Sequence, residues 1–72
     1  MNLESPLKFL RMSDLEEKIG LRRSSIYNLM NPKSKYFDPT FPKPVKLTDN
    51  GRSKRWCRLE VEAWMLSRLE TR

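Results

Sequence analysis

The sequence contains no histidine and a single cysteine, Cys57, among its 72 residues. Without histidine there is no Cys/His zinc site and no catalytic triad built on imidazole, and one cysteine cannot form an internal disulfide. Uncharged apolar runs are also short, so neither a signal peptide nor a membrane span is expected. These absences favour a soluble, cytoplasmic protein without a metal or cofactor, and they argue against an enzyme.

Acidic residues are scarce in the middle of the chain. Residues 22–58 hold ten lysines and arginines but only two acids, Asp38 and Asp49, and the whole chain has a net charge of +6. This segregation predicts a polyanion as partner, although a basic surface can also serve solubility alone. A chain of this length forms one small domain, which we place at 9–72, behind an N-terminal arm at 1–8.

A first short helix is predicted around residues 13–19. Ser13 and Glu16 have the spacing of a capping box, which satisfies free backbone donors at a helix start. Leu15 and Ile19 lie four residues apart and form a short apolar stripe, and Gly20 is a natural helix end. The pattern predicts an amphipathic helix of about two turns.

A second helix is predicted at 23–31. Ile26, Leu29 and Met30 have helical spacing, and the residue before Pro32 is disfavoured in a helix. The opposite face is polar, has no acid, and begins with two arginines; its residues are Arg22, Arg23, Ser24, Tyr27, Asn28 and Asn31.

Two helices joined by a tight Gly-Leu turn, with the second free to reach outward, are typical of a helix-turn-helix. Arg22 and Arg23 at the start of the second helix are favourable where a DNA phosphate or a guanine edge supplies negative charge. The free N–H groups of a helix start point at the same anion. The alternative is that both arginines are ordinary solvated groups.

A β-hairpin is predicted around Asn50-Gly51, which is a strong signal for a two-residue turn. Such a turn places Val45 opposite Trp56 on the core side and Lys46 opposite Arg55 on the outer side. The like-charged outer pair is destabilising unless an anion lies against it. We therefore interpret 45–58 as a basic wing whose backbone or minor-groove contacts include Arg52, Lys54 and Arg55, the alternative being a hairpin that only completes the core.

A connector and a final helix complete the chain. Residues 32–40 have no periodicity and are predicted to form a loop. Residues 59–69 are predicted to form a helix whose core positions are Val61, Trp64, Met65 and Leu69. Trp56 and Trp64 are interpreted as packing residues. The expected fold class is mostly α with a small β-hairpin, arranged as a winged helix-turn-helix.

Three motifs in order carry a family resemblance: RRSSIYNLM at 22–30, FPKPVKL at 41–47 and RWCRLEVEAW at 55–64. They resemble the AlpA family of small phage-type DNA-binding regulators, grouped with MerR-like and excisionase-like winged helix-turn-helix proteins, over about residues 9–69. The resemblance implies that helix 23–31 enters the major groove, that the hairpin is a wing, and that the biology concerns prophages or integrated elements.

The sequence departs from this family where Arg22 and Leu59 replace the usual capping residues. Each loss of an N-cap is expected to cost about 1 kcal/mol. The connector around Tyr36 and the hairpin turn are also longer than usual. We expect Arg22 to exchange stability for phosphate affinity.

The predicted function is a sequence-specific double-stranded DNA-binding transcription regulator. Arg23, Ser24 and Asn28 are the candidates for base contacts, with Arg23 suited to guanine and Asn28 to adenine. The candidates for phosphate contacts are Arg22, Tyr27, Lys46, Arg52, Lys54 and Arg55.

Two alternatives to this function stay open. One is an excisionase-like recombination directionality factor that binds and bends attachment-site DNA, and the other is an RNA or protein partner for the same basic face. No membrane or small-molecule ligand is expected. The protein is expected to be a monomer in solution or to self-associate weakly on DNA.

Overall fold

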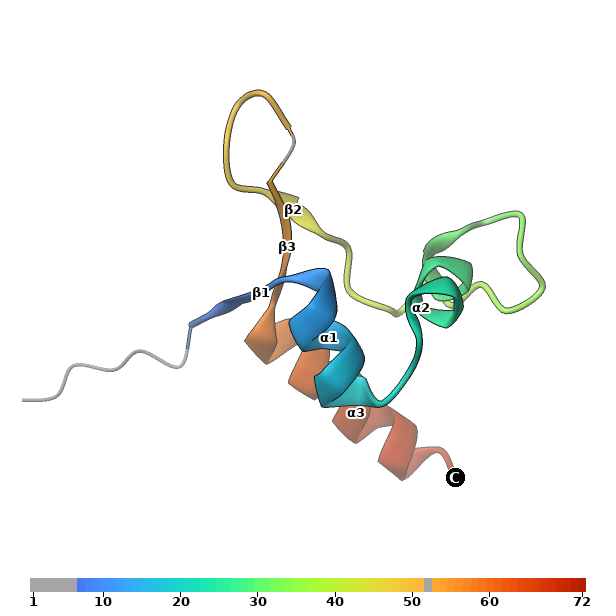
Figure 1. Cartoon of the computed structure of the whole chain (residues 1–72). Helices are drawn as coiled ribbons and strands as arrows, with labels where there is room; N and C mark the ends of the chain where they lie inside the picture. Colours follow the sequence, from blue (N-terminus) through green and yellow to red (C-terminus); the bar gives the residue numbers. More distant parts are fainter. Residues whose placement is uncertain (1–6, 52) are drawn as a thin grey trace, which may run out of the picture.

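The computed structural model describes residues 7–51 and 53–72. Three helices make up most of its regular secondary structure, and three short antiparallel strands form one sheet in the order β1-β3-β2 (Figure 1). The elements are β1 (Phe9–Leu10), α1 (Met12–Ile19), α2 (Arg23–Met30), β2 (Val45–Lys46), β3 (Lys54–Cys57) and α3 (Arg58–Glu70). The predicted class, mostly helical with a small hairpin, is confirmed at this level.

Strand β1 was not predicted, because two residues are too few to show a sequence period. It lies directly after the predicted arm at 1–8, of which the described part contains only residues 7 and 8. None of the helices within the two described ranges is long and apolar enough to cross a membrane.

Helix α1 begins at Met12, one residue before Ser13, which was its expected N-cap. The N-cap position is held by Arg11, whose backbone N–H donates to Asp14 Oδ2 at 3.0 Å, so the predicted Ser13–Glu16 capping box is wrong. The two-turn length and the end at Gly20 are confirmed. Gly20 adopts φ 83°, a left-handed conformation that glycine enters without a steric penalty, and its N–H donates to the Glu16 carbonyl at 2.8 Å.

Helix α2 follows after three residues and starts without a side-chain cap. Arg22 occupies the N-cap position and makes no capping hydrogen bond, as its side chain has no acceptor to offer. Asn31 is the C-cap, so the predicted end before Pro32 is confirmed.

The core lies where the three helices meet the sheet. Leu15, Ile26 and Val61, one from each helix, are fully buried, and the core cluster also contains buried Leu10, Phe41 and Trp56. A surface ion pair also joins two helices, with Lys18 Nζ of α1 at 2.8 Å from Glu62 Oε2 of α3. The assignment of Leu69 to the core is wrong, because its side chain is 54% exposed near the end of α3.

The hairpin register differs from the predicted one by one residue. Val45 pairs with Arg55 and Lys46 with Lys54, whereas Trp56 lies opposite Leu10 of β1. Val45 is therefore not a core partner of Trp56, and it is 38% exposed. A slip of one residue exchanges the two faces of a strand, so it changes which basic side chains lie together.

The turn explains this register. A two-residue type I′ turn needs positive φ at both central residues. Gly51 has φ 74°, but Asn50 does not adopt a positive φ. The chain instead forms a turn closed by a hydrogen bond from Gly51 N–H to the Thr48 carbonyl at 3.0 Å, and Leu47 N–H donates to the Ser53 carbonyl at 3.0 Å.

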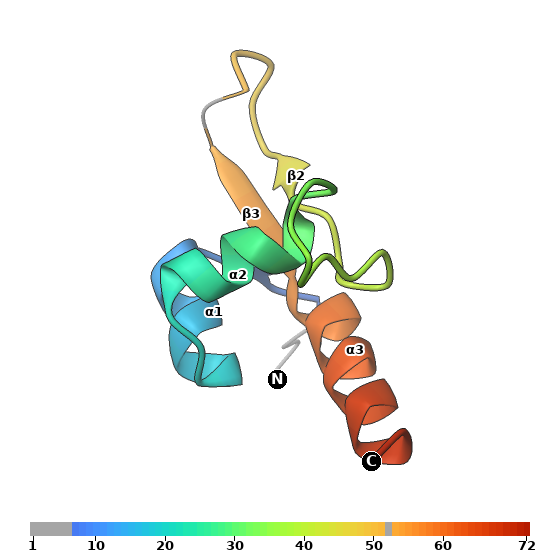
Figure 2. The same ribbon diagram turned by 90° about the vertical axis from the view of Figure 1, so that its right-hand side faces the viewer.

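Strand β3 leads into α3 without any connecting residue. Cys57 is the last residue of the strand and also the helix N-cap, and Arg58 is the first helical residue. The helix thus begins one residue before the predicted 59. Figure 2 shows β3 and α3 following one another, with the hairpin loop at one end and the C-terminus at the other. The hairpin and α3 form a continuous unit.

Candidate nucleic-acid interface

The outer surface of α2 presents the residues that the sequence singled out at its start. Arg22, Arg23 and Ser24 are exposed, and Tyr27 is 54% exposed. The first turn contains no acidic residue and no side-chain cap. The partial positive charge of the helix start therefore adds to the two guanidinium charges, which makes this end attractive to an anion.

A hollow of about 540 Å³ lies between α2 and the hairpin. Tyr27 lines it from the helix and Lys54 from β3, so the structure brings these two predicted residues together. The remaining lining side chains are apolar: Met12, Met30, Pro44 and Trp56. An apolar floor with a phenol and an ammonium group at its edges suits a sugar–phosphate chain, whose sugars are uncharged and whose phosphates accept hydrogen bonds.

The two faces of the hairpin carry different basic residues. Side chains alternate along a strand, so Lys54 shares a face with Trp56 and with its cross-strand partner Lys46. Arg55 lies on the other face with Val45, and its Nη1 donates to the Lys54 carbonyl at 2.8 Å. The structure therefore separates Arg55 from the lysines. The fourth predicted hairpin contact, Arg52, lies outside the described residues.

Asn28 occupies a separate hollow on the other flank of α2. This hollow, of about 340 Å³, lies between the helix and the connector, and it is lined by Leu21, Ser25, Asn28, Leu29 and Tyr36. Tyr36 is 59% exposed, and Lys35 Nζ lies 5.2 Å from the centre of its ring, within the range of a cation–π contact. Lys35 and Tyr36 are thus additional candidates for nucleic-acid contacts beside Asn28. The sequence did not single them out, because a loop has no period that predicts where its side chains point.

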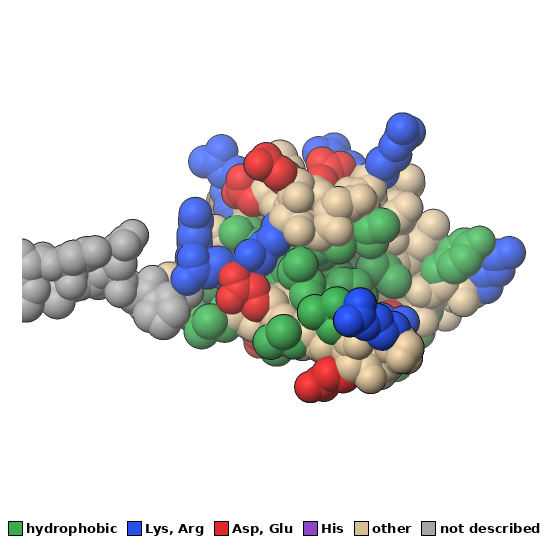
Figure 3. Space-filling view, turned by 90° about the horizontal axis from the view of Figure 1, so that it is seen from below, with side chains coloured by type: hydrophobic (Ala, Val, Ile, Leu, Met, Phe, Trp, Pro, Cys, Tyr) green, Lys and Arg blue, Asp and Glu red, His purple; other side chains and the backbone are tan. Residues whose placement is uncertain are grey.

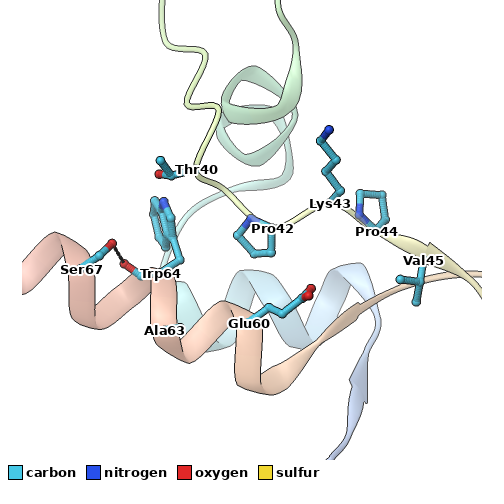
Figure 4. Close-up of a pocket in the computed structure, with 9 residues that line it drawn as sticks. All are labelled: Thr40, Pro42, Lys43, Pro44, Val45, Glu60, Ala63, Trp64 and Ser67. Carbon is cyan, nitrogen blue, oxygen red and sulfur yellow. Dashed lines mark hydrogen bonds between the residues drawn. The ribbon is translucent and has the colours of Figure 1, made fainter.

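A second groove, of about 650 Å³, lies between residues 40–45 and α3 (Figure 4). Its lining includes Pro42, Pro44, Val45 and Trp64, with Glu60 from the first turn of α3, while Lys43 points away from the helix. Seen from the α3 end, hydrophobic side chains gather in the middle of the surface with charged groups around them (Figure 3). The groove is lined by one acid, Glu60, and one lysine, Lys43, whereas the hollow beside Tyr27 is lined by Lys54 and by no acid.

The described residues contain no group of three Cys, Asp or Glu side chains close enough to hold a metal ion. The site is thus defined by an exposed basic helix start, a neighbouring hairpin with two facing lysines, and a hollow between them. These features define a class of small helical domain with an anion-attracting surface.

The chain belongs to the AlpA family. The family described as "Prophage CP4-57 regulatory protein (AlpA)" matches residues 8–69. The DNA-binding transcriptional activator AlpA of Escherichia coli strain K12 is 37% identical over 68 residues, which cover 94% of each chain. The uncharacterized protein ORF88 of enterobacteria phage P4 is 35% identical over 65 residues, covering 90% of this chain and 65% of that protein. No solved structure matches the chain significantly. Membership in a family of regulatory proteins confirms the expectation that the chain is not an enzyme.

Proposed function

We propose that this chain is a double-stranded DNA-binding transcription regulator of a prophage, with a winged helix-turn-helix fold. In this proposal α1 and α2 are the paired helices, α2 lies in the major groove, and the β2–β3 hairpin is the wing. The observation that carries it is the hollow shared by Tyr27 of α2 and Lys54 of β3. A DNA strand that follows the boundary between helix and wing meets both side chains.

The proposed contacts divide into two kinds. Arg23, Ser24 and Asn28 contact base edges, because arginine pairs with guanine and asparagine with adenine in the major groove. The residues proposed to contact phosphate groups are Arg22, Tyr27, Lys46, Arg52 and Lys54. Arg55 is proposed to contribute less to DNA binding, since it lies on the strand face opposite to that of Lys46 and Lys54.

The relative from E. coli supports the regulatory role, because it is named as a DNA-binding transcriptional activator and aligns over nearly its whole length. The charge distribution supports the partner. Ten of the fifteen lysines and arginines lie in residues 22–58, which include α2 and the hairpin. Neutralisation of phosphates by such residues releases counterions and makes binding depend steeply on salt.

The test is selection of binding sites from a random duplex library. The enriched duplex and a scrambled duplex are then titrated across a range of salt concentrations. The proposal predicts a short enriched motif that binds far more tightly than the scramble. If no motif is enriched and every duplex shows the same steep salt dependence, the basic face is only a nonspecific clamp and the proposal fails.

The variant Asn28→Ala tests the proposed base contact of a single residue. It removes one base contact, so it is expected to cost about 1 to 3 kcal/mol on the enriched duplex and to relax the preference at one base position. Lys54→Ala is the matched comparison, because loss of a phosphate contact weakens binding to both duplexes alike. Equal losses on both duplexes for Asn28→Ala would contradict its assignment to a base.

A further inference from the structure

The position of α2 relative to the wing depends on the shared core, to which α2 contributes Ile26 and β3 contributes Trp56, and also on how α2 is joined to α3. Cys57 and Arg58 are consecutive and belong to β3 and α3, so no connecting residue separates the wing from α3. Residues 31–44, which include the connector 32–40, separate α2 from the wing along the chain. A contact that ties α2 to α3 therefore also sets the spacing between the helix and the wing.

Asp38 in the connector makes this tie. Its backbone N–H donates to the carbonyl of Leu29, in the last turn of α2, at 2.9 Å. Its Oδ2 accepts a hydrogen bond from Trp64 Nε1 of α3 at 3.0 Å. A single residue thus binds the backbone of one helix and a side chain of the other.

Further contacts hold the Asp38 carboxylate in place. Oδ1 accepts from the Thr40 backbone N–H at 2.8 Å and from the Thr40 hydroxyl at 2.5 Å. The Asp38 carbonyl accepts from Phe41 N–H at 3.1 Å, and the Phe41 ring meets the Trp64 ring edge-on, with centroids 4.9 Å apart. The carboxylate is therefore oriented on one side by Thr40, and the indole that it binds is packed against buried Phe41.

We propose that Asp38 is a positioning residue that fixes the recognition helix relative to the wing and thereby contributes to the preference for specific over nonspecific DNA. This inference rests on the proposed function. A specific site requires α2 and the wing to meet their contacts simultaneously, so a fixed spacing between the two elements favours binding to that site. Nonspecific binding uses phosphates that repeat along the duplex and is less sensitive to that spacing.

The first test compares Asp38→Ala with Asp38→Asn. Both variants remove the same negative charge, so any general gain in DNA affinity from that loss is the same in the two variants. With its oxygen toward Trp64, asparagine can still accept that hydrogen bond, while its NH2 group then faces Thr40 and can only donate to the Thr40 hydroxyl; alanine can do neither. We expect D38A to lower the ratio of specific to scrambled affinity about 10-fold and D38N to lower it less than 3-fold. Equal effects of the two variants would mean that only charge matters and would overturn the proposal.

Three further variants test whether the effect comes from the hydrogen bond between Asp38 and Trp64. Trp64→Phe removes the indole donor and keeps an aromatic ring, so W64F is expected to lower the ratio like D38A. The double variant D38A/W64F is expected to show no additional loss, because both changes break the same contact. Thr40→Ala removes a hydrogen bond to Asp38 but leaves the links to Leu29 and Trp64, so T40A should retain the ratio. Additive losses in D38A/W64F would contradict the shared contact.

A second measurement is independent of DNA. Spin labels at Ser24→Cys on α2 and Leu47→Cys on the hairpin, both exposed positions, report the distance between the two elements in a Cys57→Ala background. We expect a narrow distance distribution with the native Asp38 and with D38N, and a clearly broadened one with D38A. An unchanged distribution in folded D38A overturns the positioning role. If the broadening occurs but the protein selects no DNA motif, the proposed function fails while the structural tie stands.

Discussion

Lys46 and Lys54 lie directly opposite each other across the β2–β3 ladder, on the strand face that also carries the buried Trp56. Like charges in this position destabilise a sheet. The arrangement is costly in the free protein, and a phosphate group placed between the two ammonium groups would remove the cost. Replacing one lysine of this pair should therefore change stability and DNA affinity in opposite directions.

Replacement of Lys46 by Gln is expected to raise stability and weaken DNA binding. The repulsion across the ladder disappears, and one phosphate contact is lost. Thermal unfolding measures the first effect, and titration against enriched and scrambled duplexes across salt measures the second. The slope of log affinity against log salt should fall by about 0.9. An unchanged slope would show that Lys46 does not meet a phosphate.

Arg55 and Lys54 are neighbours in sequence but should differ in DNA binding. Lys54 lines the hollow beside Tyr27, whereas Arg55 lies on the other strand face and bonds the Lys54 carbonyl. Lys54→Ala is expected to lower the salt slope by about 0.9, as for one lost phosphate contact, and Arg55→Ala to lower it by much less. A larger loss for Arg55→Ala would show that the opposite face of the hairpin meets the DNA.

Arg22→Ser is expected to stabilise the fold and weaken DNA binding. Serine at the N-cap of α2 supplies the missing acceptor, worth about 1 kcal/mol, or about 4–8 °C in melting temperature for a domain of this size. Arg11→Ser is the matched control, since Arg11 is the N-cap of α1 and likewise makes no side-chain capping bond. It should give a similar stabilisation with much less effect on binding. An Arg22→Ser variant that melts higher and binds DNA unchanged would rule out a role for Arg22.

Stability should fall at low pH through Asp38. Hydrogen bonds from the Thr40 side chain, and then from Trp64 and the Thr40 backbone, together with the positive charge of Arg68, outweigh partial burial and hold the pKa of Asp38 below its ordinary value of 3.8. A lowered pKa in the folded state means that the stabilisation is complete above the unfolded pKa and is lost as pH falls through the folded one. Melting temperatures between about pH 5 and 2 should therefore fall less for Asp38→Asn than for the native chain. Identical pH profiles would show that the Asp38 charge adds no stability.

The helices could be predicted because their signals are local. Ile26, Leu29 and Met30 have a spacing that only a helix turns to one side, and Gly20 and Pro32 mark the ends nearby. The exposed basic start of α2 follows from the same pattern. These parts of the fold depend on neighbours within one or two turns, and they agree with the structure to within one residue at the ends.

The hairpin register and the tie at Asp38 could not be predicted in the same way. The register depends on whether Asn50 adopts a left-handed conformation, and the sequence Asn-Gly permits but does not force it. The bond between Asp38 and Trp64 joins residues 26 positions apart, for which no local period exists. Because the predicted register paired Arg55 with Lys46, Arg55 was predicted to contact DNA together with the lysines, although the sheet directs its side chain to the other strand face.

The direct passage from Cys57 to Arg58 also determines where the chain can change in length. One residue inserted at this junction would turn α3 by about 100° relative to the sheet and carry Val61 out of the core. A residue inserted among the exposed residues 48–50 would lengthen only the turn of the hairpin, which costs little. The tip of the hairpin is therefore open to insertion and deletion, whereas its base is fixed in length by the helix that follows it.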